Sequence, residues 1–333
     1  MAPKSERCGL KTTPLGKEFV GFCVVRKKEV RYRQNGQPYL VWELGDWSGR
    51  LKARWWNRIE QMERQIPVGA VVKLKGIPQM CNGVREMKLI QIRRKKETED
   101  VDIRQLLPSV NKDVDQLKRQ FYGHIDGIRN QHLRTLLHHI FSRKDFAERY
   151  FLTPAGKLWH HVYLYGLLDH VVGMLNIAQV LGNNDPELNL DLLKCGIVLH
   201  DIGKIWELDL GRGYIDYTDE GRLIGHVVKG YVYVEKQMRQ VSDFPPSLWI
   251  QLGHLILSHP GDVERGAPVP PMTREAMALS LINQLDGQLN ALHRILQYDL
   301  LPGSRWSKFI PLLGRFIHVG HPAEQHHQSE DQK

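Results

Sequence analysis

The sequence predicts a multidomain protein in which an all-β barrel is followed by an all-α domain. Short β-rich apolar segments separated by turn signals fill residues 14–96, and they end in a charged block at 93–100. Beyond this block, apolar residues recur at the three- and four-residue spacing of amphipathic helices, with no parallel-sheet pattern. We therefore expect a barrel domain at 14–96, a linker and helical segment at 97–155, a helical domain at 156–318 and a disordered tail at 319–333.

Five strands are expected in the barrel domain. Asn35-Gly36 and Cys81-Asn82-Gly83 are hairpin turn signals, because Asn and Gly tolerate the positive φ that tight turns need. A short polar helix fits residues 58–64, between the third and fourth strands. The expected strands are residues 19–25, 38–44, 51–56, 70–76 and 87–92. Five strands with a helix after the third have the order of an OB-fold barrel.

The net charge of +9 is concentrated in the barrel domain. Residues 14–96 hold 19 Lys and Arg against 7 Asp and Glu, whereas residues 97–333 hold 24 against 29. This excess favours a polyanionic partner for the barrel domain. The alternative is a solvated basic surface that has no partner.

Aromatic and basic side chains alternate in the barrel domain. Single-stranded nucleic acid is held by bases that stack on such rings, at about 1–3 kcal/mol per base, while basic groups follow the phosphates. The alternative is that the rings fill the barrel, although Trp55 and Trp56 cannot both point inward, because strand side chains alternate between faces. Residues 44–56 resemble the nucleic-acid-binding OB domains of the tRNA-anticodon type. The expected nucleic-acid-binding residues are Tyr32, Arg33, Trp47, Lys52 and Arg54, with Tyr32 and Trp47 as stacking platforms.

Further sequence features limit the class of protein to which the chain can belong. Apolar spacing predicts helices over 114–130, 131–141 and 146–151, and no Gly-rich phosphate loop is present. No run approaches the roughly 18 apolar residues of a membrane span, and the N-terminus has no signal-peptide core. The four cysteines lack CxxC spacing. We expect a cytoplasmic protein with no membrane partner.

An adjacent His-Asp pair ends an apolar run in the helical region, in the stretch Leu199-His200-Asp201-Ile202-Gly203-Lys204. A lone histidine on an apolar helix is usually a core residue, but here further His and Asp residues lie close to helical core patterns. Together they favour a buried two-metal hydrolytic site. The six candidate ligands are His170, His200, Asp201, His226, His259 and Asp286.

These residues and their surroundings resemble the HD superfamily of metal-dependent phosphohydrolases. The order of the segments is similar to that of the YhaM-type 3′–5′ exoribonucleases, which also carry an OB domain ahead of the HD domain. The segments concerned are 160–170, 199–204, 217–226, 256–261 and 281–292. The resemblance is loose over about residues 14–95 and close over 157–293.

The resemblance implies a role for each candidate. The basic ligand set corresponds to His170, His200, Asp201 and Asp286. The additional ligands of two-metal members correspond to His226 and His259. Asp201 would bridge the metals, and Lys204 would hold or neutralise a phosphate, so these two are the expected catalytic residues.

One position departs from the expected pattern. Pro260 stands directly after His259, where a second histidine is expected, so the number of metals stays open. His254 is a reserve ligand, although it lies more than one helical turn before His259, and His161 is a residue that could touch substrate.

Nitrogen and oxygen ligands without thiolates suit Mn²⁺, Mg²⁺, Fe²⁺ or Co²⁺, and we expect two divalent ions, Mn²⁺ first. Such ions lower the pKa of bound water towards about 7. The first hypothesis is a metal-dependent 3′–5′ exonuclease that hydrolyses single-stranded RNA, and also single-stranded DNA, to nucleoside 5′-monophosphates. The alternatives are an HD phosphohydrolase of nucleotides or cyclic nucleotides with a regulatory OB domain, and a single-strand-binding protein with a degenerate HD domain. The sequence leaves the RNA or DNA preference and the oligomeric state open.

Overall fold

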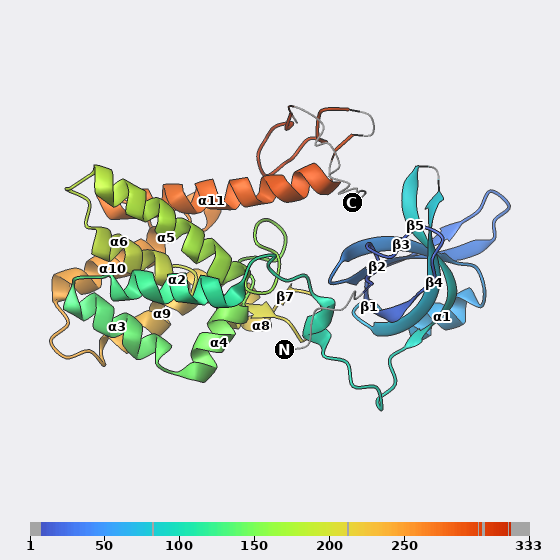
Figure 1. Cartoon of the computed structure of the whole chain (residues 1–333), viewed down its shortest axis with the longest axis horizontal. Coiled ribbons are helices and arrows are strands. Elements are labelled where there is room, and N and C mark those ends of the chain that lie inside the picture. Colours follow the sequence, from blue (N-terminus) through green and yellow to red (C-terminus); the bar gives the residue numbers. More distant parts are fainter. Residues whose placement is uncertain are drawn as a thin grey trace, which may run out of the picture.

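The computed structural model describes residues 8–81, 83–211, 213–298, 300–301, 304–318 and 320. A β-barrel lies at one end of the molecule and a helical region at the other (Figure 1). The predicted fold class, an OB-type barrel followed by a helical domain, is confirmed.

Five strands close the barrel in the order β1-β2-β3-β5-β4. The β3–β5 pair is parallel and the other neighbouring pairs are antiparallel. A short helix, α1, lies between β3 and β4 in the chain, as the OB-fold order requires. The elements are β1 (Phe19–Tyr32), β2 (Pro38–Asp46), β3 (Gly49–Trp55), α1 (Ile59–Gln65), β4 (Val71–Cys81) and β5 (Val84–Arg94).

Alternating side chains fill the barrel interior. Trp42 and Leu44 of β2 and Ala53 of β3 are fully buried. Trp55 packs against this core, whereas its neighbour Trp56 is 43% exposed. The two adjacent rings therefore lie on different faces, as strand geometry demands.

The segment before β1 supports one end of the barrel. Leu10 is fully buried in the barrel core, and its N–H donates to Asp46 Oδ2 at 2.8 Å. The other oxygen of Asp46 accepts the Ser48 N–H at 2.8 Å in the turn between β2 and β3. Asp46 thus stabilises the turn that carries Trp47 by bonding to Ser48 within the turn and to Leu10 of the N-terminal segment.

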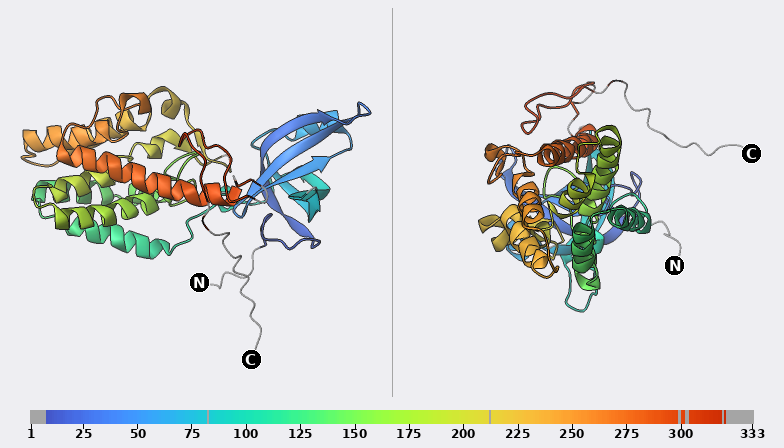
Figure 2. Two further views of the ribbon diagram at one scale, coloured as in Figure 1. Left: turned by 90° about the horizontal axis from the view of Figure 1, so that it is seen from above. Right: turned by 90° about the vertical axis from the view of Figure 1, so that its left-hand side faces the viewer.

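The helical region has one large core, in which α5 packs against α2, α4, α6 and α11. In Figures 1 and 2, α11 runs along this region with its C-terminal end towards the barrel. The helices are η1 (Ile103–Leu106), α2 (Val114–Asp126), α3 (Gln131–Phe141), α4 (Lys144–Leu152), α5 (Gly166–Asn184), α6 (Leu190–Leu199), α7 (Lys204–Glu207), α8 (Asp219–Leu223), α9 (His226–Met238), α10 (Pro246–Ser258), η2 (Val263–Arg265) and α11 (Arg274–Tyr298).

Two features of the helical region go beyond the sequence prediction. β6 (Leu208–Asp209) pairs with β7 (Asp216–Tyr217), and two residues are too few to show a strand's alternating pattern. Residues 300–318 contain isolated bridges such as Leu300 with Ser307, in place of a further helix. The predicted disordered tail, 319–333, lies outside the described residues except for Gly320. Within the described residues, no helix is long and apolar enough to cross a membrane.

The barrel contacts the helical region through the loop between β6 and β7. The guanidinium carbon of Arg26 in β1 lies 5.7 Å from the centre of the Tyr214 ring. Gly69, at φ +86°, also faces this ring, and a Cβ there would lie 3.2 Å from it. η1 packs on β1 and β2 nearby. The chain that follows α7 therefore borders the barrel.

Candidate metal centre

Five helices bring the six predicted ligands together. His170 lies within α5, His200 and His259 are the C-caps of α6 and α10, and Asp201 follows His200. His226 begins α9, and Asp286 lies in α11. His170 and His200 are fully buried, and Asp201 and His259 are each 2% exposed. Four of the six side chains are therefore buried in the helical region, whereas His226 and Asp286 are partly exposed.

Glycines allow this close approach of helices. A Cβ on Gly203, in the stretch that carries the His-Asp pair, would lie 2.0 Å from the His226 carbonyl oxygen. A Cβ on Gly173 would lie 2.6 Å from Asp286 Oδ1. Side chains at these two positions would therefore displace the elements that carry His226 and Asp286.

The ring orientation of two histidines follows from their backbone partners. His200 Nδ1 lies 2.7 Å from the Ile197 carbonyl oxygen, and His259 Nδ1 lies 2.7 Å from that of Ile256. A carbonyl only accepts, so each Nδ1 carries the hydrogen and each Nε2 presents a lone pair. Burial, together with the neighbouring His200, lowers the pKa of His259 to about 4, so its ring is neutral at neutral pH.

The third ring is oriented by a carboxylate. His226 Nδ1 lies 2.8 Å from Glu207 Oε1, which orients the ring so that its Nε2 faces Asp201. Asp201 Oδ1 lies 3.3 Å from His226 Nε2 and 3.5 Å from His259 Nε2, and it has no hydrogen-bond partner among the described residues. His200 Nε2 also has no hydrogen-bond partner among the described residues, and it lies 3.3 Å from Asp201 Oδ2.

Lone pairs that face a carboxylate repel one another unless a cation lies between them. Burial alone would raise the pKa of Asp201, but the nearby Lys204 ammonium holds it well below its usual range, so the group is a carboxylate. Neutral imidazole nitrogen and carboxylate oxygen are the donors that divalent metals prefer, and the hydrogen bonds to the far ring nitrogens are typical of metal-binding histidines. The residues present therefore fit a divalent metal.

Potential ligand atoms form three overlapping groups within the described residues, and in each group they lie within 4.8 Å of one another. Asp201 and His170 each belong to two groups, so the three groups are continuous. The groups are His161 with His170 and Asp286, His170 with His200 and Asp201, and Asp201 with His226 and His259.

His161 is the residue that sequence reasoning undervalued. Its Nε2 lies 2.8 Å from Asp286 Oδ2, the oxygen that His170 Nδ1 approaches to 2.6 Å. Its Nδ1 lies 2.7 Å from the Tyr163 hydroxyl, which donates to Asp169 Oδ2 at 2.7 Å. His161 also adopts a positive φ of 45°, a rare conformation for a non-glycine residue. The available signal was its place nine residues before His170 in a His-His pair.

Lys204 and His254 make contacts other than those expected from the sequence. Lys204 is 7% exposed, and its ammonium donates to Asp201 Oδ2 at 2.6 Å and to the Ala155 carbonyl. It is therefore directed at the carboxylate instead of at an open phosphate position. The reserve candidate His254 accepts the Met272 N–H at 2.9 Å through its Nε2 and is not part of the three groups.

The predicted barrel residues occupy two ends of the β2–β3 surface. Tyr32 is 70% exposed at the end of β1, and the Arg33 guanidinium lies 3.9 Å from the centre of the Trp56 ring. Lys52 is exposed on β3, and Arg54 donates to Glu86 Oε1 at 2.8 Å. Trp47 is half-buried and follows the C-terminal end of the nine-residue β2. At the rise of a strand, it lies roughly 25 Å from the other end of β2, where the hairpin with β1 is.

The rings near the hairpin of β1 and β2 form a stack that the sequence did not single out. Tyr39 and Trp56 are stacked with 4.5 Å between ring centres, and Arg33 covers the Trp56 ring. Figure 1 shows this hairpin on the side of the barrel away from the helices. The exposed aromatic surface thus consists of Tyr32 and Trp56 with the half-buried Tyr39 beneath Trp56, and Trp47 lies apart from it.

The structure combines a closed OB-type barrel with a helical domain that contains a buried His-Asp centre. This combination defines the class of HD-domain hydrolases that carry an OB barrel of the nucleic-acid-binding type. The HD domain family matches residues 167–288, which contain all six predicted ligands. The helical region is therefore an HD domain, the domain of metal-dependent phosphohydrolases.

The relatives of the chain extend this match to about nine tenths of its length. The 3′-5′ exoribonuclease YhaM of Oceanobacillus iheyensis is 32% identical over 295 residues, which cover 89% of this chain and 92% of that protein. The 3′-5′ exoribonuclease YhaM of Bacillus subtilis is 30% identical over 307 residues, which cover 92% and 96%. Among solved structures, the second OB-fold domain of replication protein A from Methanococcus maripaludis matches 28% of this chain and 98% of its own, with 14% identity and a TM-score of 0.22. The chain belongs to the family of the 3′-5′ exoribonuclease YhaM.

Proposed function

We propose that this chain is a metal-dependent 3′–5′ exoribonuclease that hydrolyses single-stranded RNA to nucleoside 5′-monophosphates. Family membership supports the activity, since the relatives carry this name. The observation that supports the chemistry most is the meeting of three imidazole Nε2 atoms at the unprotonated Asp201 carboxylate. This arrangement suits a bound cation, and it lies in a hydrolase domain.

The proposed ligands are His170, His200, Asp201, His226, His259 and Asp286, with two ions as the expected number. Divalent ions held there would polarise the phosphodiester and lower the pKa of water. The three continuous ligand groups support two ions, because Asp201 can contribute one oxygen to each. Mn²⁺ is the first candidate, and Mg²⁺, Fe²⁺ and Co²⁺ fit the same donor atoms.

The surrounding residues position the ligands. Glu207 holds the His226 ring through Nδ1, and backbone carbonyls hold the other two rings. Tyr163 donates to Asp169, and together they support His161 against Asp286. In this proposal Lys204 fixes the Asp201 carboxylate and compensates its charge in the protein interior.

The barrel would bind the single strand upstream of the cleaved end. Its exposed aromatic surface offers stacking, and its basic residues offer charge for phosphates. Lys52 is exposed and available to a phosphate, whereas the pairing of Arg54 with Glu86 makes Arg54 a weaker candidate. The contact of the barrel with the loop after α7 places the barrel beside the domain that carries the metal centre.

The direct test is digestion of 5′-labelled oligonucleotides by the purified full-length chain with Mn²⁺. We expect a ladder of single-nucleotide steps on RNA, release of 5′-monophosphates, and no digestion when the 3′ end carries a phosphate. A parallel DNA oligonucleotide measures the contribution of the 2′-hydroxyl. Cleavage of a circular single strand would contradict the proposal, and hydrolysis of mononucleotides or cyclic nucleotides alone would favour the nucleotide phosphohydrolase.

A further inference from the structure

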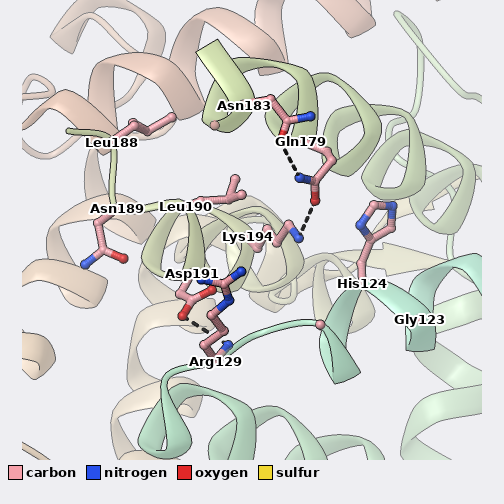
Figure 3. A pocket seen from close by; sticks show the side chains of 12 residues that line it. Gly123, His124, Arg129, Gln179, Asn183, Leu188, Asn189, Leu190, Asp191 and Lys194 are labelled. Atoms are coloured by element: carbon pink, nitrogen blue, oxygen red, sulfur yellow. Dashed lines mark hydrogen bonds between the residues drawn. The ribbon is translucent and has the colours of Figure 1, made fainter. Parts of the chain in front are cut away.

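A polar pocket of about 550 Å³ opens between α2, α5 and α6, on a different part of the HD domain from the metal ligands (Figure 3). Its volume is within the range that holds a small organic ligand. The polar side chains that line it include His124, Arg129, Gln179, Asn183, Asp191 and Lys194, and three glycines complete much of the wall.

The two cations in this pocket form no ion pair among the described residues, although Asp191 lines the same space. Lys194 is only 5% exposed, and its Nζ donates to the neutral Gln179 Oε1 at 2.7 Å. Arg129 makes no ion pair with its side chain within the described part of the chain. Figure 3 shows both charged groups directed into the same space, with the His124 ring on the α2 side. A buried ammonium that is bonded only to an amide is costly unless an anion joins it.

The one carboxylate in the pocket is already committed. Asp191 Oδ2 accepts the backbone N–H groups of Arg129 and Asn130 at 3.0 and 2.8 Å. Burial lowers the pKa of Lys194, and the nearby Arg129 lowers it further, while Asp191 acts in the opposite direction. The pocket therefore retains an excess of hydrogen-bond donors and positive charge.

Glycine keeps one wall of the pocket open. Gly123 lies within α2, and a Cβ built on it meets nothing within 4 Å. Gly127 and Gly182 also line the space without side chains. The carboxamides of Gln179 and Asn183 face it from α5. Such groups suit the donor and acceptor edge of a nucleobase.

We propose that this pocket binds a phosphorylated small molecule of mononucleotide size, with the phosphate on Lys194 and Arg129. The phosphate group matches two adjacent cations, because it carries more charge and more acceptor oxygens than a carboxylate. Lys194 and His200 are six residues apart along α6, about 9 Å at the rise of a helix. The proposed ligand pocket is thus separate from the metal centre, although α6 contributes residues to both. The site stands without the exoribonuclease proposal, and only the choice of a nucleoside 5′-monophosphate as the probe rests on it.

Calorimetric titration of the full-length chain tests this site. The probes are adenosine 5′-monophosphate, inorganic phosphate and adenosine, each titrated with EDTA and again with Mn²⁺. We expect the monophosphate to bind in EDTA, phosphate to bind more weakly and adenosine most weakly. Binding that occurs only with Mn²⁺ would assign the ligand to the metal centre and overturn the proposal.

Two substitutions locate the bound ligand. Lys194→Met should weaken binding of the monophosphate about 10- to 100-fold, because a charge-assisted hydrogen bond is lost. Lys236→Met, at an exposed lysine of α9, is the matched control and should leave binding unchanged. Gly123→Met should abolish binding by filling the pocket while every charge is kept, and methionine is a better helix former than glycine.

Folding and hydrolysis are measured on the same variants. Lys194→Met removes a buried charge, so the unliganded variant should melt no lower than the parent chain. Unchanged monophosphate binding in both Lys194→Met and Gly123→Met would overturn the proposal. An equal loss of long RNA binding in Lys194→Met would also overturn it, because the pocket would then hold the RNA backbone. If the chain failed to digest RNA but bound the monophosphate as described, only the exoribonuclease proposal would fail.

Discussion

The carboxylate of Asp201 lies between an ammonium and three imidazole nitrogens, and each partner predicts a different consequence of substitution. Asp201→Asn removes the charge of a carboxylate that lies within 3.5 Å of three imidazole Nε2 atoms. We expect hydrolysis and tight metal binding to be lost, while long-RNA binding persists because the basic surface is on the barrel. Activity and metal content are the measurements, and Asp262→Asn, at an exposed carboxylate, is the control. Normal turnover in Asp201→Asn would sink the proposed metal centre.

The ammonium of Lys204 predicts a stability effect that depends on metal. In Lys204→Met the Asp201 carboxylate stays buried without its nearest positive charge. Removing one partner of a buried ion pair costs about 3–5 kcal/mol, and a bound cation would replace the lost charge. We expect a large loss of unfolding free energy in EDTA and a much smaller loss with Mn²⁺, both from denaturant titrations. Equal losses in the two conditions would show that Lys204 does not compensate Asp201.

His161 shows what residue patterns could not supply. Its contact with Asp286 joins positions 125 residues apart, and no local periodicity encodes such a pair. The predicted ligands were found because each lies in a motif with a helical core pattern. His161 lies in a loop with positive φ, where hydrophobic periodicity carries no information.

At the scale of elements, two tryptophans near the β2–β3 surface have different expected roles. One is exposed and can stack on a nucleobase, and the other is half-buried and stabilises the fold. Trp56 is exposed and stacked on Tyr39, whereas Trp47 is half-buried in a turn. We expect Trp56→Ala to weaken binding of single-stranded RNA by about 1–3 kcal/mol with little change in melting temperature. The same change at Trp47 should lower the melting temperature more than the affinity. Affinity and melting measured on both variants decide the matter, and the reverse result would restore Trp47 as the platform.

The ribbon of β6 and β7 is held by a carboxylate with a shifted pKa. Burial raises the pKa of Asp216, but the hydrogen bond from Lys157 and the Tyr217 N–H lower it by more, and Arg222 adds to this. A lowered folded pKa gives stability above the unfolded pKa of about 4, and this stability is lost as pH falls through the folded value.

Asp216→Asn should therefore lower the unfolding free energy by about 1 kcal/mol at pH 7. The difference from the parent chain should shrink below about pH 4, where the unfolded-state carboxyl is protonated. Denaturant titrations at pH 7, 5 and 3.5 measure it. A constant difference across this range would show that the charge of Asp216 contributes nothing.

The sequence predicted long elements better than short ones. The hairpin signal at Asn35-Gly36 and the apolar alternation of β2 and β3 led to the barrel, and three- and four-residue spacing led to α2 and α3. The two-residue strands β6 and β7 have no such period. The contact of Tyr214 with Arg26 also joins two domains, so only the folded chain shows it.

For the whole molecule, the separate cores of barrel and HD domain predict separable functions. A chain that lacks residues 1–100 should still hydrolyse very short RNA but bind long strands weakly. Binding by the full chain should fall with salt, with a log–log slope of about −0.7 for each phosphate neutralised, and the truncated chain should show a far shallower slope. Equal affinity and equal salt dependence in the two chains would exclude the barrel as the RNA platform.

The unpaired lone pairs around Asp201 also concern the lifetime of the protein in a cell. Without a cation, the centre of the HD domain contains buried atoms of His200 and Asp201 that lack a hydrogen-bond partner among the described residues, so the domain opens more often. Proteases cut the opened chain, and their rate follows the population of that state. Newly made copies that fail to load metal should therefore be degraded first. Pulse proteolysis with graded Mn²⁺ would show survival rising with metal occupancy, so that the supply of the ion sets the amount of enzyme as well as its rate.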